Sequence, residues 1–212
     1  AVTPSVTAAI NLIGAAASVT TSTAGTAAFG LDAGAGNDSV DNEGELDVSA
    51  ESDAVTVNVS IAAGGVAAAT DAAWNGGTTA EAFAWGIDAG DGDDTVTNAF
   101  GVNSSADAGT VSEGTAVNAV GVSGVVATST ADARAFGITG GDGEDSLSNI
   151  QNDEGTSAGI SADATATATS VAVSVSPAGG AFAGDAAWDG GTTAEAKARG
   201  MDGGAGDDTV DN

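Results

Sequence analysis

The sequence predicts an all-β protein, specifically a β-solenoid of the parallel β-helix or β-roll kind built from about four repeats. Three observations predict it. One 13-residue segment recurs four times, the stretches between the copies alternate apolar and polar residues, and Gly is abundant (33 residues in 212). With only five Phe, three Trp and no Tyr, the chain cannot fill a broad core with large side chains. It can bury Ala, Val and Thr in thin layers between closely spaced strands.

The repeated segment sets the organisation of the chain. It runs over residues 30–42, 86–98, 137–149 and 200–212, with starts 56, 51 and 63 residues apart. We therefore expect a single repeat array over 1–212, with units of approximately 1–42, 43–98, 99–149 and 150–212. Neither end shows an evident capping repeat. We expect a piece of a longer array, or a subunit that stacks end to end.

Alternation with a period of two residues indicates strands between the copies. The clearest runs cover residues 55–61, 131–136, 162–169 and 171–175. Ala at alternate positions suggests an inward face of small residues and a flattened solenoid. Asn75–Gly77 and Asp189–Gly191 are typical of tight turns, and Ala33–Gly34 and Gly140–Gly141 mark further reversals. A unit of about 55 residues allows one broad coil or two narrower ones.

Within the repeated segment, Gly203–Asp211 and Gly140–Ser148 match the nonapeptide Gly-Gly-x-Gly-x-Asp-x-U-x, in which U is a large apolar residue. Ala33 and Ala89 replace the first Gly in the other two copies. The motif resembles the RTX (repeats-in-toxin) calcium-binding repeats. Family members usually carry the nonapeptide in tandem, whereas here about 40 other residues separate the copies.

The resemblance implies Ca²⁺ sites at turns stacked on successive coils. Glycine permits the positive φ that a chain needs to wrap a cation, and Asp supplies the hard oxygen that Ca²⁺ prefers. Asp38, Asp94, Asp145 and Asp208 are the implied main ligands; Asp32, Asp88 and Asp202 could add to them, and Thr139 interrupts that column. The candidate metal residues are thus Asp32, Gly34, Gly36, Asp38, Asp88, Gly90, Gly92, Asp94, Gly141, Gly143, Asp145, Asp202, Gly204, Gly206 and Asp208. The alternative is that these segments are only good β-turns.

Composition excludes several functions. Thirty acidic residues against three basic ones give a formal net charge of −27, which opposes compaction and nucleic-acid binding. Either divalent cations offset this charge or it forms a solvated acidic surface. The absence of Cys and His excludes disulfides and Cys or His catalysis. No run is long or apolar enough to span a membrane.

Aromatic and basic residues leave one question open. Phe29, Trp85 and Phe136 precede the repeated segment, Arg199 takes the same place in the fourth unit, and Trp74 corresponds to Trp188. Such columns form either a sugar-binding platform or stacked packing residues.

The leading functional hypothesis is a secreted, calcium-stabilised structural protein: an extracellular filament, matrix component or adhesin stalk, without enzymatic activity. Its expected partners are other copies, end to end, and a polysaccharide or cell surface. The alternative is a calcium-binding repeat module of a larger secreted enzyme, toxin or carbohydrate-binding adhesin. A polysaccharide lyase is disfavoured, because only Arg134, Lys197 and Arg199 are cationic, and the first two have no evident equivalents in the other units.

Overall fold

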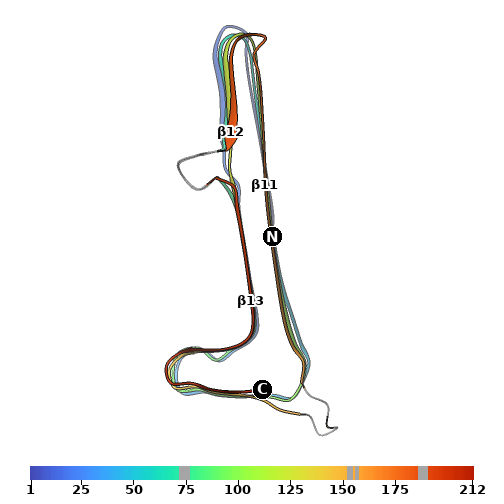
Figure 1. Ribbon diagram of the computed structural model, residues 1–212, viewed down its shortest axis with the longest axis vertical. Coiled ribbons are helices and arrows are strands. Elements are labelled where there is room, and N and C mark those ends of the chain that lie inside the picture. The colour runs from blue at the N-terminus through green and yellow to red at the C-terminus, as the bar shows by residue number, and fades with distance from the viewer. Residues whose placement is uncertain (72–76, 152–154, 156–157, 186–190) are drawn as a thin grey trace.

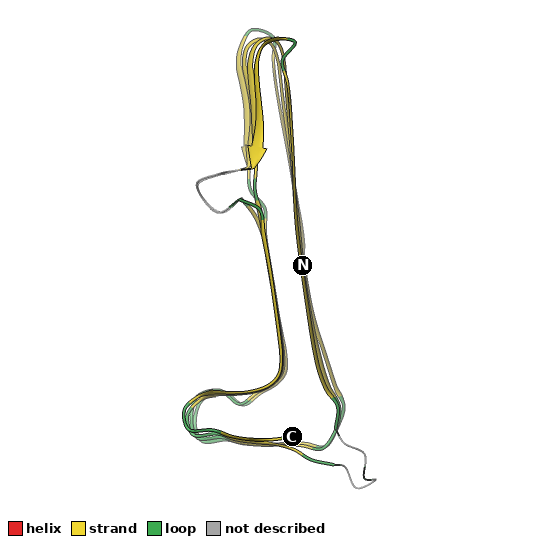
Figure 2. Cartoon of the chain, viewed as in Figure 1, coloured by secondary structure: helices red, strands yellow, loops and turns green. Residues whose placement is uncertain are grey.

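The computed structural model describes residues 1–71, 77–151, 155, 158–185 and 191–212. The regular elements in these residues are all β-strands (Figure 2). In chain order they are β1 Val2–Asn11, β2 Gly14–Thr20, β3 Thr23–Asp32, β4 Ser39–Asn42, β5 Leu46–Asp71, β6 Thr78–Asp88, β7 Thr95–Asn98, β8 Val102–Ala127, β9 Ser129–Asp142, β10 Ser146–Asn149, β11 Ile160–Val175, β12 Ala178–Asp185, β13 Thr193–Ala205 and β14 Thr209–Asp211. The predicted all-β class is confirmed.

The strands form three parallel sheets. The first has the order β1-β5-β8-β11, with β2 also paired to β5 and β12 to β8. The second has the order β14-β10-β7-β4 and the third β13-β9-β6-β3. Every sheet takes strands from all four sequence units, so each unit makes one broad circuit through the three sheets and the next unit stacks on it (Figure 1).

Each circuit has a long, narrow arm and a foot. Figure 1 shows β11 as one wall of the arm and β12 and β13 as the opposite wall, with the foot at the lower end. The foot contains the four copies of the repeated segment, which connect the third sheet to the second. Strand register aligns these copies: Val96 pairs with Val40 on one side and with Leu147 on the other.

Small side chains fill the arm because its two walls lie close together. One core cluster there consists of Ala residues from five strands together with Val48. The hydroxyls of Thr56 and Thr78, from opposite walls, lie 2.7 Å apart in a hydrogen bond. The run at 55–61 turns its polar residues Thr56, Asn58 and Ser60 inward. The inward Ala face predicted from the sequence is therefore present, with hydroxyl and amide groups beside it.

The core of the foot is built from larger apolar side chains than the core of the arm. Ile87, Ile138, Val96, Leu147 and Val102 are almost fully buried there. The apolar residue that follows each Gly-Asp turn by two positions points into this core in the middle units, whereas Val210 in the last unit is 47% exposed.

The register also corrects one sequence-based expectation. Lys197 is the direct strand neighbour of Arg134, and Arg199 is the neighbour of Phe136. Arg134 and Lys197 therefore occupy equivalent positions in consecutive units.

Some predicted features lie outside the described residues. These are Trp74 and Trp188, and the turn residues at 75–76 and 189–190. Among the residues that are described, none belongs to a helix suited to crossing a lipid bilayer.

The closeness of the arm walls gives a first prediction. Ala133 is fully buried between them. Ala133→Leu adds three carbons where no space exists and should lower the free energy of unfolding by about 1–3 kcal/mol, measured by urea denaturation. Ala119→Leu, at an exposed alanine, is the matched control and should change it by less than about 0.5 kcal/mol. Equal effects of the two substitutions would contradict tight wall packing.

Candidate metal centre at the stacked glycine–aspartate turns

The four glycine–aspartate turns share one backbone conformation. Gly34, Gly90, Gly141 and Gly204 have φ values of 92°, 97°, 105° and 100°. The second glycines, Gly36, Gly92, Gly143 and Gly206, have φ values of 126°, 131°, 147° and 149°. All eight candidate glycines thus occupy the left-handed region that side chains disfavour.

These turns also stack backbone on backbone. The N–H of Asp91 donates to Gly34 O (2.9 Å), and the N–H of Gly36 donates to Asp91 O (2.7 Å). A Cβ at Gly90 would overlap Gly34 O, and one at Gly92 would overlap Gly36 O. In the second, third and fourth turns the glycines are therefore required twice, for the positive φ and for the close approach of the preceding turn.

An unbroken column of aspartates lies behind the glycines. The backbone N–H of Asp38 donates to Asp94 Oδ1 (2.7 Å), that of Asp94 to Asp145 Oδ1 (2.9 Å), and that of Asp145 to Asp208 Oδ1 (3.0 Å). The structure thus brings together the four implied main ligands. Asp94 and Asp145, in the middle, are 1% and 2% exposed.

The second carboxylate oxygens of this column are different. Oδ2 of Asp38, of Asp94 and of Asp145 is buried and has no hydrogen-bond partner among the described residues. A buried carboxylate oxygen without a donor is costly. The same buried oxygen lacks a donor in three consecutive units, which indicates that this environment is a property of the repeat.

Within each of the last two turns, the carboxylate lies against the first glycine of the nonapeptide. A Cβ at Gly140 would come within 2.5 Å of Asp145 Oδ2, and one at Gly203 within 2.8 Å of Asp208 Oδ2. The aspartate therefore folds back over its own turn and does not point away into solvent.

The second set of candidate ligands is less continuous. Asp32 pairs with Asp88, and Thr139 separates Asp88 from Asp202. Burial, and then the nearby Asp32 carboxylate, raise the pKa of Asp88 above its ordinary value. Asp202 forms an ion pair with Arg199.

Electrostatics oppose the fully ionised aspartate column. Burial raises the pKa of Asp145, and the carboxylates of Asp94, Asp208 and Asp93 add to this effect. The hydrogen bond from the Asp94 N–H acts in the opposite direction. Neighbouring strands lie about 4.8 Å apart, so ionised aspartates in successive circuits repel one another.

Carboxylates alone do not surround a common point. Among the described residues, no three acidic side chains gather in a way that would hold one metal ion. A cation at these turns would have to combine one or two carboxylates with backbone carbonyl oxygens, which is an ordinary ligand set for Ca²⁺.

A second ladder at these turns was not singled out from the sequence. Nδ2 of Asn42 donates to Asn98 Oδ1 (2.6 Å), Nδ2 of Asn98 to Asn149 Oδ1 (2.8 Å), and Nδ2 of Asn149 to Asn212 Oδ1 (2.6 Å). The signal was present, because Asn ends every copy of the repeated segment. The amide ladder ties together the exits of the four turns.

No protein-family model, curated protein or solved structure matches the chain. The likeness to RTX repeats therefore rests on the motif residues alone.

The stacking of the turns predicts that Gly90→Ala is strongly destabilising. The added methyl group meets both the positive φ and the carbonyl of Gly34, so the free energy of unfolding should fall by roughly 2–4 kcal/mol. Gly124→Ala is the control, because a Cβ there meets open space at ordinary φ, and it should be nearly neutral. Urea denaturation of both variants measures the difference, and similar stabilities would refute the requirement for glycine.

The raised pKa values predict the sign of the pH dependence when divalent ions are absent. The folded-state pKa values of Asp88 and Asp145 lie above the unfolded value of about 3.9. The folded chain therefore binds more protons, and the stability from these groups is greatest below about pH 4 and is lost as pH rises through the folded pKa. The lowered pKa of Glu195, caused by Lys197, has the opposite sign but belongs to an exposed pair. In calcium-free buffer, the Tm should be higher at pH 4 than at pH 7.5; an equal or lower Tm at pH 4 would contradict this account.

Proposed function

We propose that the chain is a β-solenoid that serves as a calcium-stabilised structural element outside the cell, in a filament, matrix or adhesin stalk. One observation carries the proposal: the unbroken column of aspartates whose buried Oδ2 atoms lack hydrogen-bond donors in three consecutive units.

The donor set fits Ca²⁺. Asp38, Asp94, Asp145 and Asp208 would hold the ions, together with carbonyl oxygens of the glycine turns. Each ion supplies the positive charge that the stacked carboxylates lack, and it takes oxygen ligands from flexible backbone as well as from side chains. In this proposal the metal acts on stability and supports no chemical reaction.

The proposed extracellular location follows from the calcium affinity expected of such sites. Sites with few carboxylate ligands bind Ca²⁺ weakly. We expect a Kd of about 10⁻⁴–10⁻³ M, as in extracellular modules, so such sites fill only where calcium is abundant. A chain with 30 acidic residues and no Cys or His therefore fits a calcium-rich exterior and a structural task better than catalysis.

Association of copies end to end is part of the proposal. The outermost strands of the sheets are those of the first and last units, such as β3 and β13, or β4 and β14. Strand edges offer backbone groups for further pairing. The aspartate column and the asparagine ladder have the same direction. In both, each unit donates hydrogen bonds to the next, from Asp38 towards Asp208 and from Asn42 towards Asn212. A second copy stacked on the last unit would continue both ladders with the same polarity.

The calcium proposal predicts opposite effects of one substitution in two buffers. Asp145→Asn keeps an oxygen that accepts the Asp94 N–H but removes a buried negative charge. In chelator the free energy of unfolding should rise by about 1–3 kcal/mol, because repulsion falls. Wild type should gain about 2.7 kcal/mol per site when Ca²⁺ is 100 times its Kd, and the variant should lose most of the gain that its site contributes.

Asp163→Asn, at an exposed residue, is the charge-matched control and should keep the full calcium response. Circular dichroism and light scattering during calcium titration measure fold and assembly together. A calcium response that survives Asp145→Asn unchanged would exclude the aspartate column. Stabilisation without particle growth would retain calcium binding but replace the filament by a module of a larger secreted protein.

A further inference from the structure

All three basic residues of the chain line one open groove. The chain has only three Lys and Arg against 30 acidic residues, and Arg134, Lys197 and Arg199 all face this hollow of about 460 Å³ on the outer side of β6, β9 and β13. The rest of the lining is Phe83, Trp85, Phe136, Thr139 and Asp202. A hollow that gathers every basic side chain of a strongly negative chain calls for a functional account.

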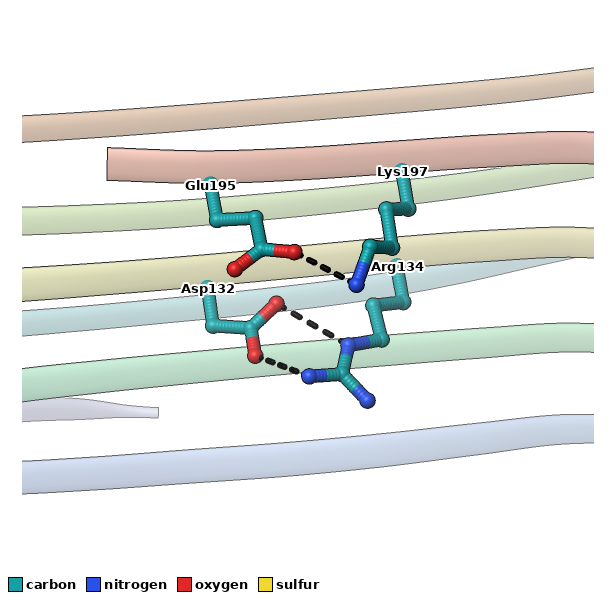
Figure 3. A network of polar contacts seen from close by, with 4 residues as sticks. All are labelled: Asp132, Arg134, Glu195 and Lys197. Carbon is teal, nitrogen blue, oxygen red and sulfur yellow. Dashed lines mark hydrogen bonds and ion pairs between the residues drawn. The ribbon is translucent and has the colours of Figure 1, made fainter. Parts of the chain in front are cut away.

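Ion pairs along the strands hold the basic side chains in place. Asp132 accepts from Nε (3.1 Å) and Nη2 (2.6 Å) of Arg134, and Lys197 Nζ lies 2.5 Å from Glu195 (Figure 3). Arg199 pairs with Asp202.

Donors remain for a ligand despite these pairs. Of the three acidic partners, only Asp202 belongs to the groove lining, and Asp132 and Glu195 pair with Arg134 and Lys197 outside that lining. A guanidinium has five N–H donors and an ammonium has three. Each cation is therefore oriented by its partner and still has hydrogen atoms to donate.

The aromatic residues of the groove have ring faces covered by other side chains. Trp85 stacks between Phe29, with a centroid distance of 4.6 Å, and Phe136, at 6.0 Å, with interplanar angles of 4° and 11°. Both faces of Trp85 are thus covered by rings from the neighbouring units, and its edge is left for the groove. Arg134 lies 5.4 Å from the centroid of Phe83 and occupies a face of that ring.

This arrangement disfavours stacking of a sugar on an aromatic face and favours binding of an anionic sugar. A platform for sugars needs a free aromatic face, which Trp85 lacks. Ring edges carry partial positive charge, so they favour electron-rich oxygen atoms, as the three cations do. The groove is therefore suited to an anionic ligand with many oxygen atoms.

We propose that this groove binds a carboxylate-bearing sugar of an acidic polysaccharide. Arg134, Lys197 and Arg199 receive the carboxylate, and Thr139 and Asp202 bond to hydroxyl groups. The concave shape suits a narrow sugar chain, since ligand sites commonly have volumes of about 300–1,000 Å³. The binding does not use the aspartate column, so it stands or falls independently of the calcium proposal.

The test uses the 212-residue chain with two soluble probes of equal length, tetragalacturonate and the neutral cellotetraose, by isothermal titration calorimetry. Tetragalacturonate should bind with a Kd that rises with NaCl, and cellotetraose should bind at least about tenfold more weakly. Arg134→Ala and Lys197→Ala should each raise the Kd for tetragalacturonate about tenfold, as expected for loss of one charge-assisted contact.

Ala119→Asp is the matched control, because it makes the same change of net charge on an exposed residue of β8 outside the groove lining. It should change the Kd by less than about twofold. Circular dichroism establishes that each variant is folded, and Asp145→Asn should leave galacturonate binding intact. Equal binding of cellotetraose, an unchanged Kd in both groove variants, or no binding of tetragalacturonate at millimolar concentration would overturn the proposal.

Discussion

The parallel, in-register stacking of the four circuits is the constraint on which the rest of the structure depends. Each residue lies about 4.8 Å from its equivalent in the next unit, so a residue type that repeats in the sequence must tolerate contact with itself. Glycine tolerates it because no Cβ stands between Gly34 and Gly90. Asparagine gains from it, because one amide donates to the next. The repeated segment combines the residues that stack well on their own kind.

Acidic residues tolerate this stacking least, and uncharged residues interrupt several of their columns. Thr139 divides Asp88 from Asp202, Gly109 and Thr167 follow Asp53, and Thr97 and Ser148 separate Asp41 from Asp211. The aspartate column from Asp38 to Asp208 is continuous across all four units and buried in the middle two. Glu81, Asp132 and Glu195 also stack through three units, but there Arg134 and Lys197 pair with Asp132 and Glu195. The column from Asp38 to Asp208 has no basic partner among the described residues, and this contrast supports a bound cation at the turns.

Much of this fold was accessible from the sequence. The motif period predicted the stacked turns, and alternation predicted the strands, because both are local patterns. Alternation alone does not decide which face is inward. In the run at 55–61, hydrophobicity favours Val57 inside, yet the narrow arm admits Thr56 and Asn58, and the valines face outward. The distance between the two walls of the arm depends on the whole circuit, so the sequence of either strand alone does not predict it. The pairing of Lys197 with Arg134 was readable from the sequence, since both precede the first glycine of their repeated segment by three residues.

The groove shares Thr139 and Asp202 with the second set of candidate ligands, and this overlap narrows the choice of metal ligands. Asp202 lines the groove and pairs with Arg199, and it belongs to the column that begins with Asp32 and Asp88 and contains Thr139. A carboxylate engaged by a guanidinium is a poor ligand for a second cation, and threonine supplies no charge. In the third and fourth units Thr139 and Asp202 therefore belong to the groove, and the four aspartates behind the glycines remain as the continuous set of proposed calcium ligands. The turns begin where β9 and β13 end, so the two proposed sites adjoin each other without sharing any of these four aspartates.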